Sequence, residues 1–292
     1  MDEFRQLEGL RREFIDVGEV KLHTVLAGPP DGPLVILLHG FPEFWYGWRN
    51  QILPLSQAGF LVATPDQRGY NLSPKPRELS AYRVDRLAGD VIGLIRALGH
   101  EKAILVGHDW GGIVAWTAAA LYPRHVARLV ALNAPYLMVT PDVIQRNPAQ
   151  LRMSAYILFF QTPIFAEAIL RNNNWELLAQ ALRRTSRPGT FPEAAIEQYR
   201  QAWWRQGAMT AMLNWYRALL RRPPPLPRRP RISAPTLILW GAGDTALSRP
   251  MAQLSAALCD HVRLVFFEHA SHWVQHEEAE KVNELMIEFL GE

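Results

Sequence analysis

The chain has 292 residues, of which 49% are hydrophobic, and its formal net charge at pH 7 is +3. This length and apolar content suit one α/β domain with a substantial insertion. The positive excess is too small for nucleic-acid binding, which requires a concentrated basic face, so we expect no nucleic-acid partner. The arginine cluster between residues 221 and 231 is interleaved with prolines, a pattern typical of a solvated linker.

The single cysteine, Cys259, excludes an intrachain disulfide framework, as is usual in a reducing compartment. The first residues lack the positive-then-apolar pattern of a signal peptide, and no apolar run reaches the roughly 18–20 residues of a membrane span. We therefore expect a soluble cytoplasmic protein without a membrane partner. No metal-ligand spacing and no glycine-rich phosphate loop occurs, so we expect neither metal nor cofactor. A homodimer is left open.

The first half of the chain alternates predicted strands and helices. A hairpin about Gly18 is expected from segments 14–17 and 21–27. Buried parallel strands are nearly continuous in apolar residues, which predicts strands at 34–38, 60–64, 103–106 and 128–132. Helical spacing extends over 84–98 and ends near Gly99. The alternation predicts a doubly wound, mostly parallel sheet.

The pattern then changes to helical, aromatic-rich segments, expected at 149–160, 164–171, 175–184, 192–204 and 208–220. Strands resume at 236–240 and 262–267. A helical block between strands of one sheet predicts a cap over the carboxyl edge of the sheet, where it shields the site from water. We therefore divide the chain into an α/β core, residues 1–136 and 231–292, and an inserted helical cap, residues 137–230.

The most informative motif is Gly107-His108-Asp109-Trp110-Gly111-Gly112, between the strand at 103–106 and a predicted helix at 113–121. It indicates a nucleophile elbow, a strained strand-to-helix turn that exposes one side chain, usually a serine. Here that residue is Asp109. A carboxylate attacks an sp³ carbon and forms an alkyl ester, which water then hydrolyses. The predicted reaction class is two-step hydrolysis of an epoxide or a haloalkane.

The partners of Asp109 should follow in the order acid and then histidine. Asp244 comes just after the strand at 236–240, and His272 just after the strand at 262–267. Both therefore belong at the carboxyl edge of the sheet, where ligands bind. We expect His272 to activate the hydrolytic water and Asp244 to orient and stabilise its imidazole. The neighbouring His269 and His276 are expected on the surface.

The tetrahedral intermediate needs preorganised donors for its oxyanion. We expect the backbone N–H groups of Phe41 and Trp110 to supply them. We also place His39, Pro42, Trp110 and Trp215 around a small apolar substrate, an epoxide or a haloalkane, that reacts with water.

Further motifs accompany the elbow: HGFPEFWY at 39–46, DQRGY at 66–70, NAP at 133–135, NWYR at 214–217 and SHW at 271–273. With these motifs the chain resembles the epoxide hydrolases of the α/β-hydrolase fold over roughly residues 12–290. In detail it is similar to the microbial soluble enzymes and to the membrane-anchored animal branch, although no anchor segment is seen. The resemblance implies an eight-stranded sheet with an inserted helical cap.

The resemblance also implies two cap tyrosines that hydrogen-bond the alkoxide during ring opening. Tyr216 lies in the NWYR motif, and the segment at 154–161 nominates Tyr156, with Tyr199 as the substitute. A phenol suits this role because its reference pKa of about 10 keeps it protonated at neutral pH.

The main alternative is a haloalkane or haloacid dehalogenase with the same nucleophile. Haloalkane dehalogenases typically carry asparagine at the position of Phe41, and fluoroacetate dehalogenases carry arginine at the position of Trp110 and the triad acid at the position of Asn133. These departures, with the two tyrosines, favour an epoxide. A purely binding role would require a missing triad member, and none is missing.

Overall fold

The structure, a computed structural model, describes Leu7, residues 10–224 and residues 231–292. Its eight strands form one sheet in the order β1-β2-β4-β3-β5-β6-β7-β8. The two pairs formed by β2 are antiparallel and all others are parallel, which confirms the predicted sheet. The strands are β1 (Arg11–Asp16), β2 (Lys21–Ala27), β3 (Leu34–Leu38), β4 (Leu61–Pro65), β5 (Ala103–His108), β6 (Val126–Leu132), β7 (Thr236–Gly241) and β8 (Val262–Phe267).

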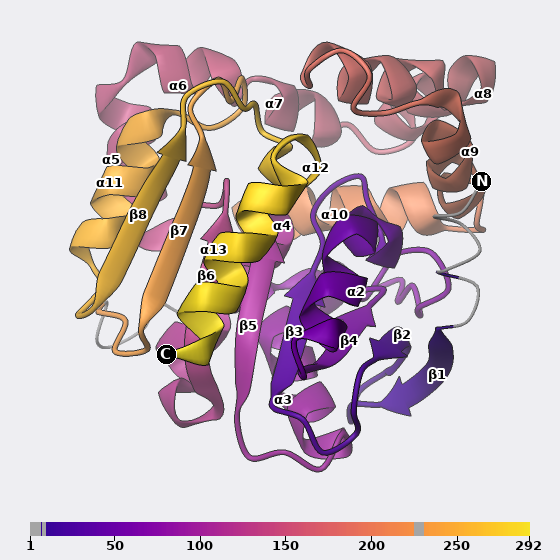
Figure 1. The fold of residues 1–292 in the computed structure, drawn as a ribbon. Helices are drawn as coiled ribbons and strands as arrows, with labels where there is room; N and C mark the ends of the chain where they lie inside the picture. The colour runs from indigo at the N-terminus through magenta and orange to yellow at the C-terminus, as the bar shows by residue number, and fades with distance from the viewer. Residues whose placement is uncertain (1–6, 8–9, 225–230) are drawn as a thin grey trace.

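The central strands are buried along their whole length because helices cover both faces of the sheet. On one face α2 (Arg49–Gln57) packs against α13 (Ala279–Gly291), and α12 (Val274–Glu277) adjoins both. On the other, α3 (Val84–Ala97) packs against α4 (Trp110–Leu121). Helix α11 (Arg249–Ala257) contacts β7 and β8 (Figure 1).

Between β6 and β7 the described residues contain helices. The outer ones lie beyond the arrowheads of β7 and β8, at the carboxyl edge of the sheet (Figure 1). The helices described between β6 and β7 are α5 (Thr140–Arg146), α6 (Pro148–Met153), α7 (Tyr156–Phe160), α8 (Phe165–Arg184), α9 (Glu193–Trp203) and α10 (Ala208–Arg221). Below, "the cap" means these six helices.

The cap differs from its prediction in one place and agrees in another. The helix predicted at 149–160 is divided between α6 and α7, and α6 begins at Pro148, capped by the side chain of Asn147. The predicted break before residue 175 is confirmed: Asn173, Asn174 and Trp175 have left-handed backbone angles inside α8. Asparagine tolerates this conformation better than most residues do, which explains a kink at this point.

Element ends shift by a few residues elsewhere. Strand β1 begins at Arg11 rather than at residue 14, because it pairs with β2 from Arg11 onward. Its first residues are exposed and therefore lack the apolar pattern that would have indicated a strand. Helix α4 begins directly at Trp110.

Much of the predicted basic linker, residues 225–230, lies outside the described residues. Among the described residues no single helix is long and apolar enough to cross a membrane, whereas the bent pair Pro148–Phe160 and Phe165–Arg184 passes by length and composition.

Candidate active site

Asp109 sits in a sharp turn between β5 and α4. Its φ of 51° and ψ of −122° are strained for a residue with a side chain. The turn closes tightly because Gly111 packs on the backbone of β3, where a Cβ atom would overlap the Leu38 carbonyl oxygen. Gly40 leaves room in the same way for the side chain of Asp109. This local geometry is that of the predicted elbow.

The structure brings Asp109, His272 and Asp244 together at the carboxyl edge of the sheet. The Nδ1 atom of His272 lies 2.7 Å from Oδ2 of Asp244. Its Nε2 atom faces Asp109, 3.7 Å from Oδ2. Asp244 and His272 are buried, and Asp109 is partly buried. The imidazole is therefore held by one carboxylate and directed toward the other.

Asn133 fixes Asp244 from the neighbouring strand end, a role that the sequence analysis missed. Its side-chain amide donates to Oδ2 of Asp244 at 2.7 Å and accepts from the N–H of Gly241 at 2.8 Å. The other carboxylate oxygen accepts the N–H groups of Ala246 and Leu247. Asn133 follows β6 directly, so its position at this edge was a signal that could have identified it.

The charged groups of the site shift one another's pKa values. Burial alone would raise the pKa of Asp244, but the charge and hydrogen bond of His272, with Asn133 and Ala246, hold it below its ordinary value. Burial alone would lower the pKa of His272, but Asp244 and, more weakly, Asp109 raise it to about 9. The resting site therefore favours an imidazolium between two carboxylates.

Of the two predicted oxyanion donors, Phe41 contacts the nucleophile: its N–H donates to Oδ1 of Asp109 at 2.9 Å. Trp110 is the first residue of α4, directly after Asp109, so its N–H belongs to the positive end of that helix.

A cavity of about 370 Å³ opens above Asp109 and His272. Its wall is mainly apolar and comes from the cap and from the loops after the strands. Tyr156 and Tyr216 both line it, and their ring centroids lie 6.0 Å apart. Tyr199 is not among the lining residues; it is buried and donates its hydroxyl proton to Oε1 of Glu43 at 2.6 Å.

Three of the four residues predicted to surround the substrate do not line this cavity, and only Pro42 does. His39 is fully buried, with its Nε2 atom accepting the N–H of Gln67. Trp215 donates to the carbonyl of Arg68 from a buried position, and the ring of Trp110 lies behind Tyr216, 5.0 Å between centroids. These side chains support the wall instead. Most of the wall itself is formed by residues that were not predicted to surround the substrate: Met153, Phe159, Phe160, Leu177, Leu178, Ala181, Leu182, Thr185, Thr245, Ala246 and Trp273.

A buried polar cluster adjoins the site on the core side. The carboxylate of Glu43 accepts hydrogen bonds from Tyr199 and Gln275 and lies 2.8 Å from Nε2 of His276. The Nε2 atom of His108 lies 2.8 Å from the carbonyl oxygen of His272. The prediction that His276 lies on the surface was wrong, because its side chain is 1% exposed. The described residues contain no group of three or more side chains that could hold a metal ion.

The sequence and the fold match known proteins along most of the chain. The model of the α/β hydrolase fold family matches residues 33–279. A Bacillus subtilis protein named AB hydrolase superfamily protein YfhM is 45% identical over 97% of this chain and 99% of its own length. Human epoxide hydrolase 4 is 35% identical over 94% of this chain and 76% of its own.

Solved structures agree. The epoxide hydrolase of Bacillus megaterium, in complex with an inhibitor, superposes with a TM-score of 0.86 at 30% identity, covering 97% of this chain and 100% of its own. A mutant of an epoxide hydrolase from the same organism, in complex with its product, a naphthyloxy-propane-1,2-diol, gives a TM-score of 0.87 at 31% identity, covering 96% of this chain and 100% of its own. Sequence, fold and site geometry therefore lead to one conclusion: the chain belongs to the epoxide hydrolases of the α/β-hydrolase fold.

Proposed function

We propose that this protein hydrolyses apolar epoxides to vicinal diols through an ester on Asp109. The observation that carries the proposal is that two pairs of reactive side chains face each other across one apolar cavity. Asp109 and His272 lie on the core side, and the phenols of Tyr156 and Tyr216 lie on the cap side. An epoxide between them has a nucleophile at its carbon and proton donors at its oxygen.

In the first step an oxygen of Asp109 attacks an epoxide carbon, and the carbon–oxygen bond of the ring breaks. The developing alkoxide takes hydrogen bonds, and then a proton, from the tyrosines. Burial raises the pKa of Tyr216 well above its ordinary value, and Tyr156 and Asp109 add to the rise. Tyr156 is 37% exposed as a residue, but burial of its hydroxyl group, with the charge of Asp109, also raises its pKa. Both phenols therefore remain protonated.

In the second step His272 removes a proton from water, and the hydroxide attacks the carbonyl carbon of the Asp109 ester. The oxyanion forms where Phe41 donates its N–H, with the N–H of Trp110 as the second donor. Its collapse releases the diol and restores the carboxylate, and the proton that His272 took from water returns to the tyrosine that protonated the alkoxide. Forming the ester removes the charge of Asp109, which is one of the causes that raise the pKa of His272. Alkylation thus shifts the imidazole toward the free base that this step needs.

The cavity indicates the substrate class. Its wall is mainly apolar, with Phe159, Phe160 and Leu178 among its members. The structural relative from Bacillus megaterium was solved with an aryloxy diol as its product. We propose aryl and aryloxymethyl epoxides as substrates of this protein.

The test is product analysis with purified protein and the Asp109→Ala variant as control. The panel contains styrene oxide, phenyl glycidyl ether, an internal alkyl epoxide, 1-bromobutane and fluoroacetate. We expect diol formation that is lost in the variant, without halide release. Halide release without diol would overturn the proposal in favour of a dehalogenase, and full activity of Asp109→Ala would refute the nucleophile.

A further inference from the structure

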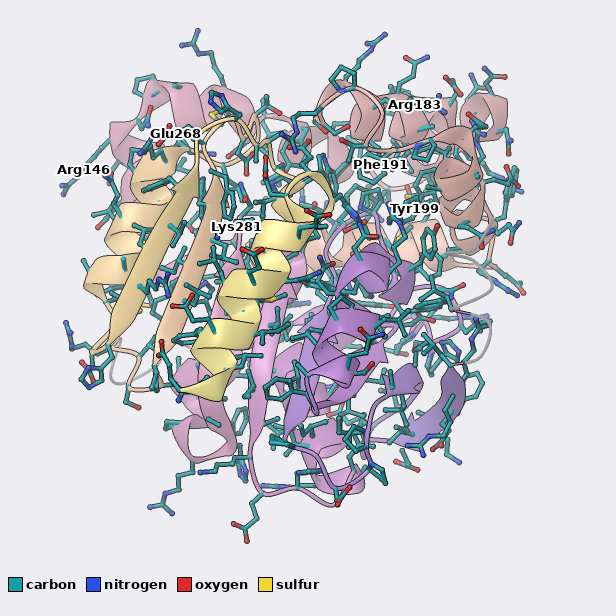
Figure 2. All side chains as sticks on the ribbon, viewed as in Figure 1. Arg146, Arg183, Phe191, Tyr199, Glu268 and Lys281 are labelled. Atoms are coloured by element: carbon teal, nitrogen blue, oxygen red, sulfur yellow. The ribbon has the colours of Figure 1, made fainter. Side chains whose placement is uncertain are left out.

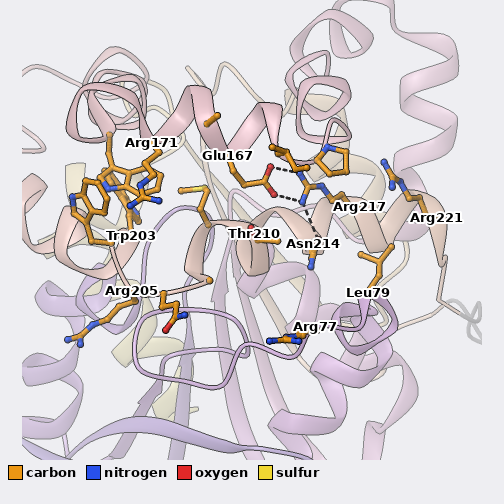
Figure 3. A pocket seen from close by; sticks show the side chains of 18 residues that line it. Arg77, Leu79, Glu167, Arg171, Trp203, Arg205, Thr210, Asn214, Arg217 and Arg221 are labelled. Atoms are coloured by element: carbon orange, nitrogen blue, oxygen red, sulfur yellow. Dashed lines mark hydrogen bonds and ion pairs between the residues drawn. The ribbon is translucent and has the colours of Figure 1, made fainter.

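A second cavity, of about 830 Å³, lies along α10 (Figure 3). Its walls come from α8 and α10 of the cap and from the segment around Arg77 and Leu79 of the core. Among the described residues, none lines both this cavity and the active-site cavity. Helix α10 separates the two, because Thr210 and Asn214 face this groove while Tyr216 lines the other cavity. We call it the α8–α10 groove.

The α8–α10 groove is strongly basic. The described residues that line it include five arginines and one acidic residue, Glu167. Glu167 is already neutralised by Arg217, which donates to both of its oxygens at 2.7 and 3.1 Å. The other four guanidinium groups have no carboxylate partner among the described residues: Arg77, Arg171, Arg205 and Arg221. Four cations around one groove form a positive field that attracts anions.

One wall of the groove is aromatic and rigid. Trp204 is 45% exposed, yet its indole N–H donates to Oδ1 of Asn174 at 2.8 Å, which fixes the ring. Trp175 packs edge-on against it, 5.3 Å between centroids. The guanidinium of Arg171 lies over the face of the Trp204 ring, 4.6 Å from its centre. The exposed part of this Trp204–Arg171 stack is a flat, cationic surface against which a planar ring can pack.

The start of α10 adds to the positive field. This 14-residue helix begins at Ala208, and its N-cap residue, Gly207, has no side chain with which to cap it. Gly207, Met209 and Thr210, around that N-terminus, line the groove. The positive end of the helix dipole therefore acts in the same direction as the arginines.

We propose that the α8–α10 groove is a binding site for an organic anion with an aromatic body and two acidic groups. The body packs against the Trp204–Arg171 stack, one acidic group meets Arg171 and Arg205, and the second meets Arg77 and Arg221. Figure 3 shows Arg171 and Arg205 toward one end of the groove, Arg221 toward the other, and Arg77 on the core side below α10. A volume of about 830 Å³ lies within the range of small-molecule sites. Such a ligand contacts the core and the cap at once.

The probe is naphthalene-1,5-disulfonate, titrated by calorimetry at low ionic strength, with neutral 1,5-dihydroxynaphthalene for comparison. The site variant is Arg77→Gln with Arg205→Gln; both side chains are exposed and have no described ion pair, so the fold should be retained. The matched control is Arg124→Gln with Arg146→Gln, which removes the same charge at exposed positions outside the groove. Far-ultraviolet circular dichroism checks that both variants fold.

We expect one disulfonate to bind the wild type and the control, to raise their Tm, and to lose affinity as salt is added. In the site variant the affinity should fall about tenfold or more, because two charge-assisted contacts are lost. Equal affinity for all three proteins, or equal binding of the neutral diol, would overturn the proposal, since the probe would then occupy the active-site cavity or bind nonspecifically. Absence of binding to the wild type would overturn it as well.

Discussion

His272 changes its protonation state during the proposed cycle. It must be neutral when it accepts a proton from water, and it is cationic afterwards. Its pKa of about 9 in the resting site is raised by Asp244 and Asp109, against the effect of burial. Because the ester on Asp109 removes one of those charges, the pKa of His272 should be lower in the intermediate than in the free protein.

The protonation state of His272 therefore predicts a pH dependence for the second step, hydrolysis of the ester. In single-turnover experiments followed by intact mass, decay of the adduct should accelerate as pH rises, with a midpoint below pH 9, because only the neutral imidazole accepts a proton. In His272→Gln the adduct should persist at every pH. Decay at a constant rate between pH 6 and 9 in the wild type would contradict this assignment.

The two cap tyrosines should act on the first step. Removing one phenol by Tyr216→Phe or Tyr156→Phe should slow formation of the ester by roughly ten- to hundredfold, because general acids contribute about 10²–10⁴ and one donor remains. Hydrolysis of ester that has already formed should change little. The measurement is the rate of the mass adduct's appearance. An equal slowing of both steps would indicate that the tyrosines only pack.

At the scale of elements, the elbow depends on the contact between α4 and β3. Gly111→Ala places a Cβ atom on the Leu38 carbonyl oxygen, which is backbone and cannot rotate away. We expect unfolding to become easier by about 2–4 kcal/mol. The matched control is Gly89→Ala in α3, where an added Cβ meets nothing and alanine stabilises a helix by up to about 1 kcal/mol. Urea unfolding of both variants measures the difference, and similar stabilities would refute the packing argument.

The order of strands and helices was largely predictable from the sequence, because each buried strand is recognisable from its own run of apolar residues. The run at 34–38 matches β3 residue for residue, and the run at 236–240 matches β7 except for its last residue. Both strands are buried on both faces and must therefore be almost continuously apolar. The division between α6 and α7 was not predicted. Apolar spacing continues across residues 154 and 155, so periodicity alone does not reveal the break.

For the whole molecule, the docking of the cap on the core includes a buried polar contact. Tyr199 of α9 donates to Glu43 of the core, where Figure 2 shows it beside the core and below the outer cap helices. Tyr199→Phe leaves the Glu43 carboxylate with one donor fewer, which should cost about 1–3 kcal/mol of stability. Ester formation should slow far less than in Tyr216→Phe. Unfolding in urea and the single-turnover rate separate the two effects, and a stability equal to the wild type would contradict the docking role.

The sequence by itself determined the α/β fold, the elbow and the order of Asp109, Asp244 and His272, since a strand end and the turn after it are fixed by neighbouring residues. Only the tertiary structure decided which side chains reach the cavity. His39 and Trp215 adjoin site residues in the chain but turn into the core, where Gln67 and Arg68 satisfy their polar atoms. Their places in the wall are taken by Phe160 and Leu178 of the cap. Side-chain direction is set by the packing of distant segments, and one segment alone does not contain that information.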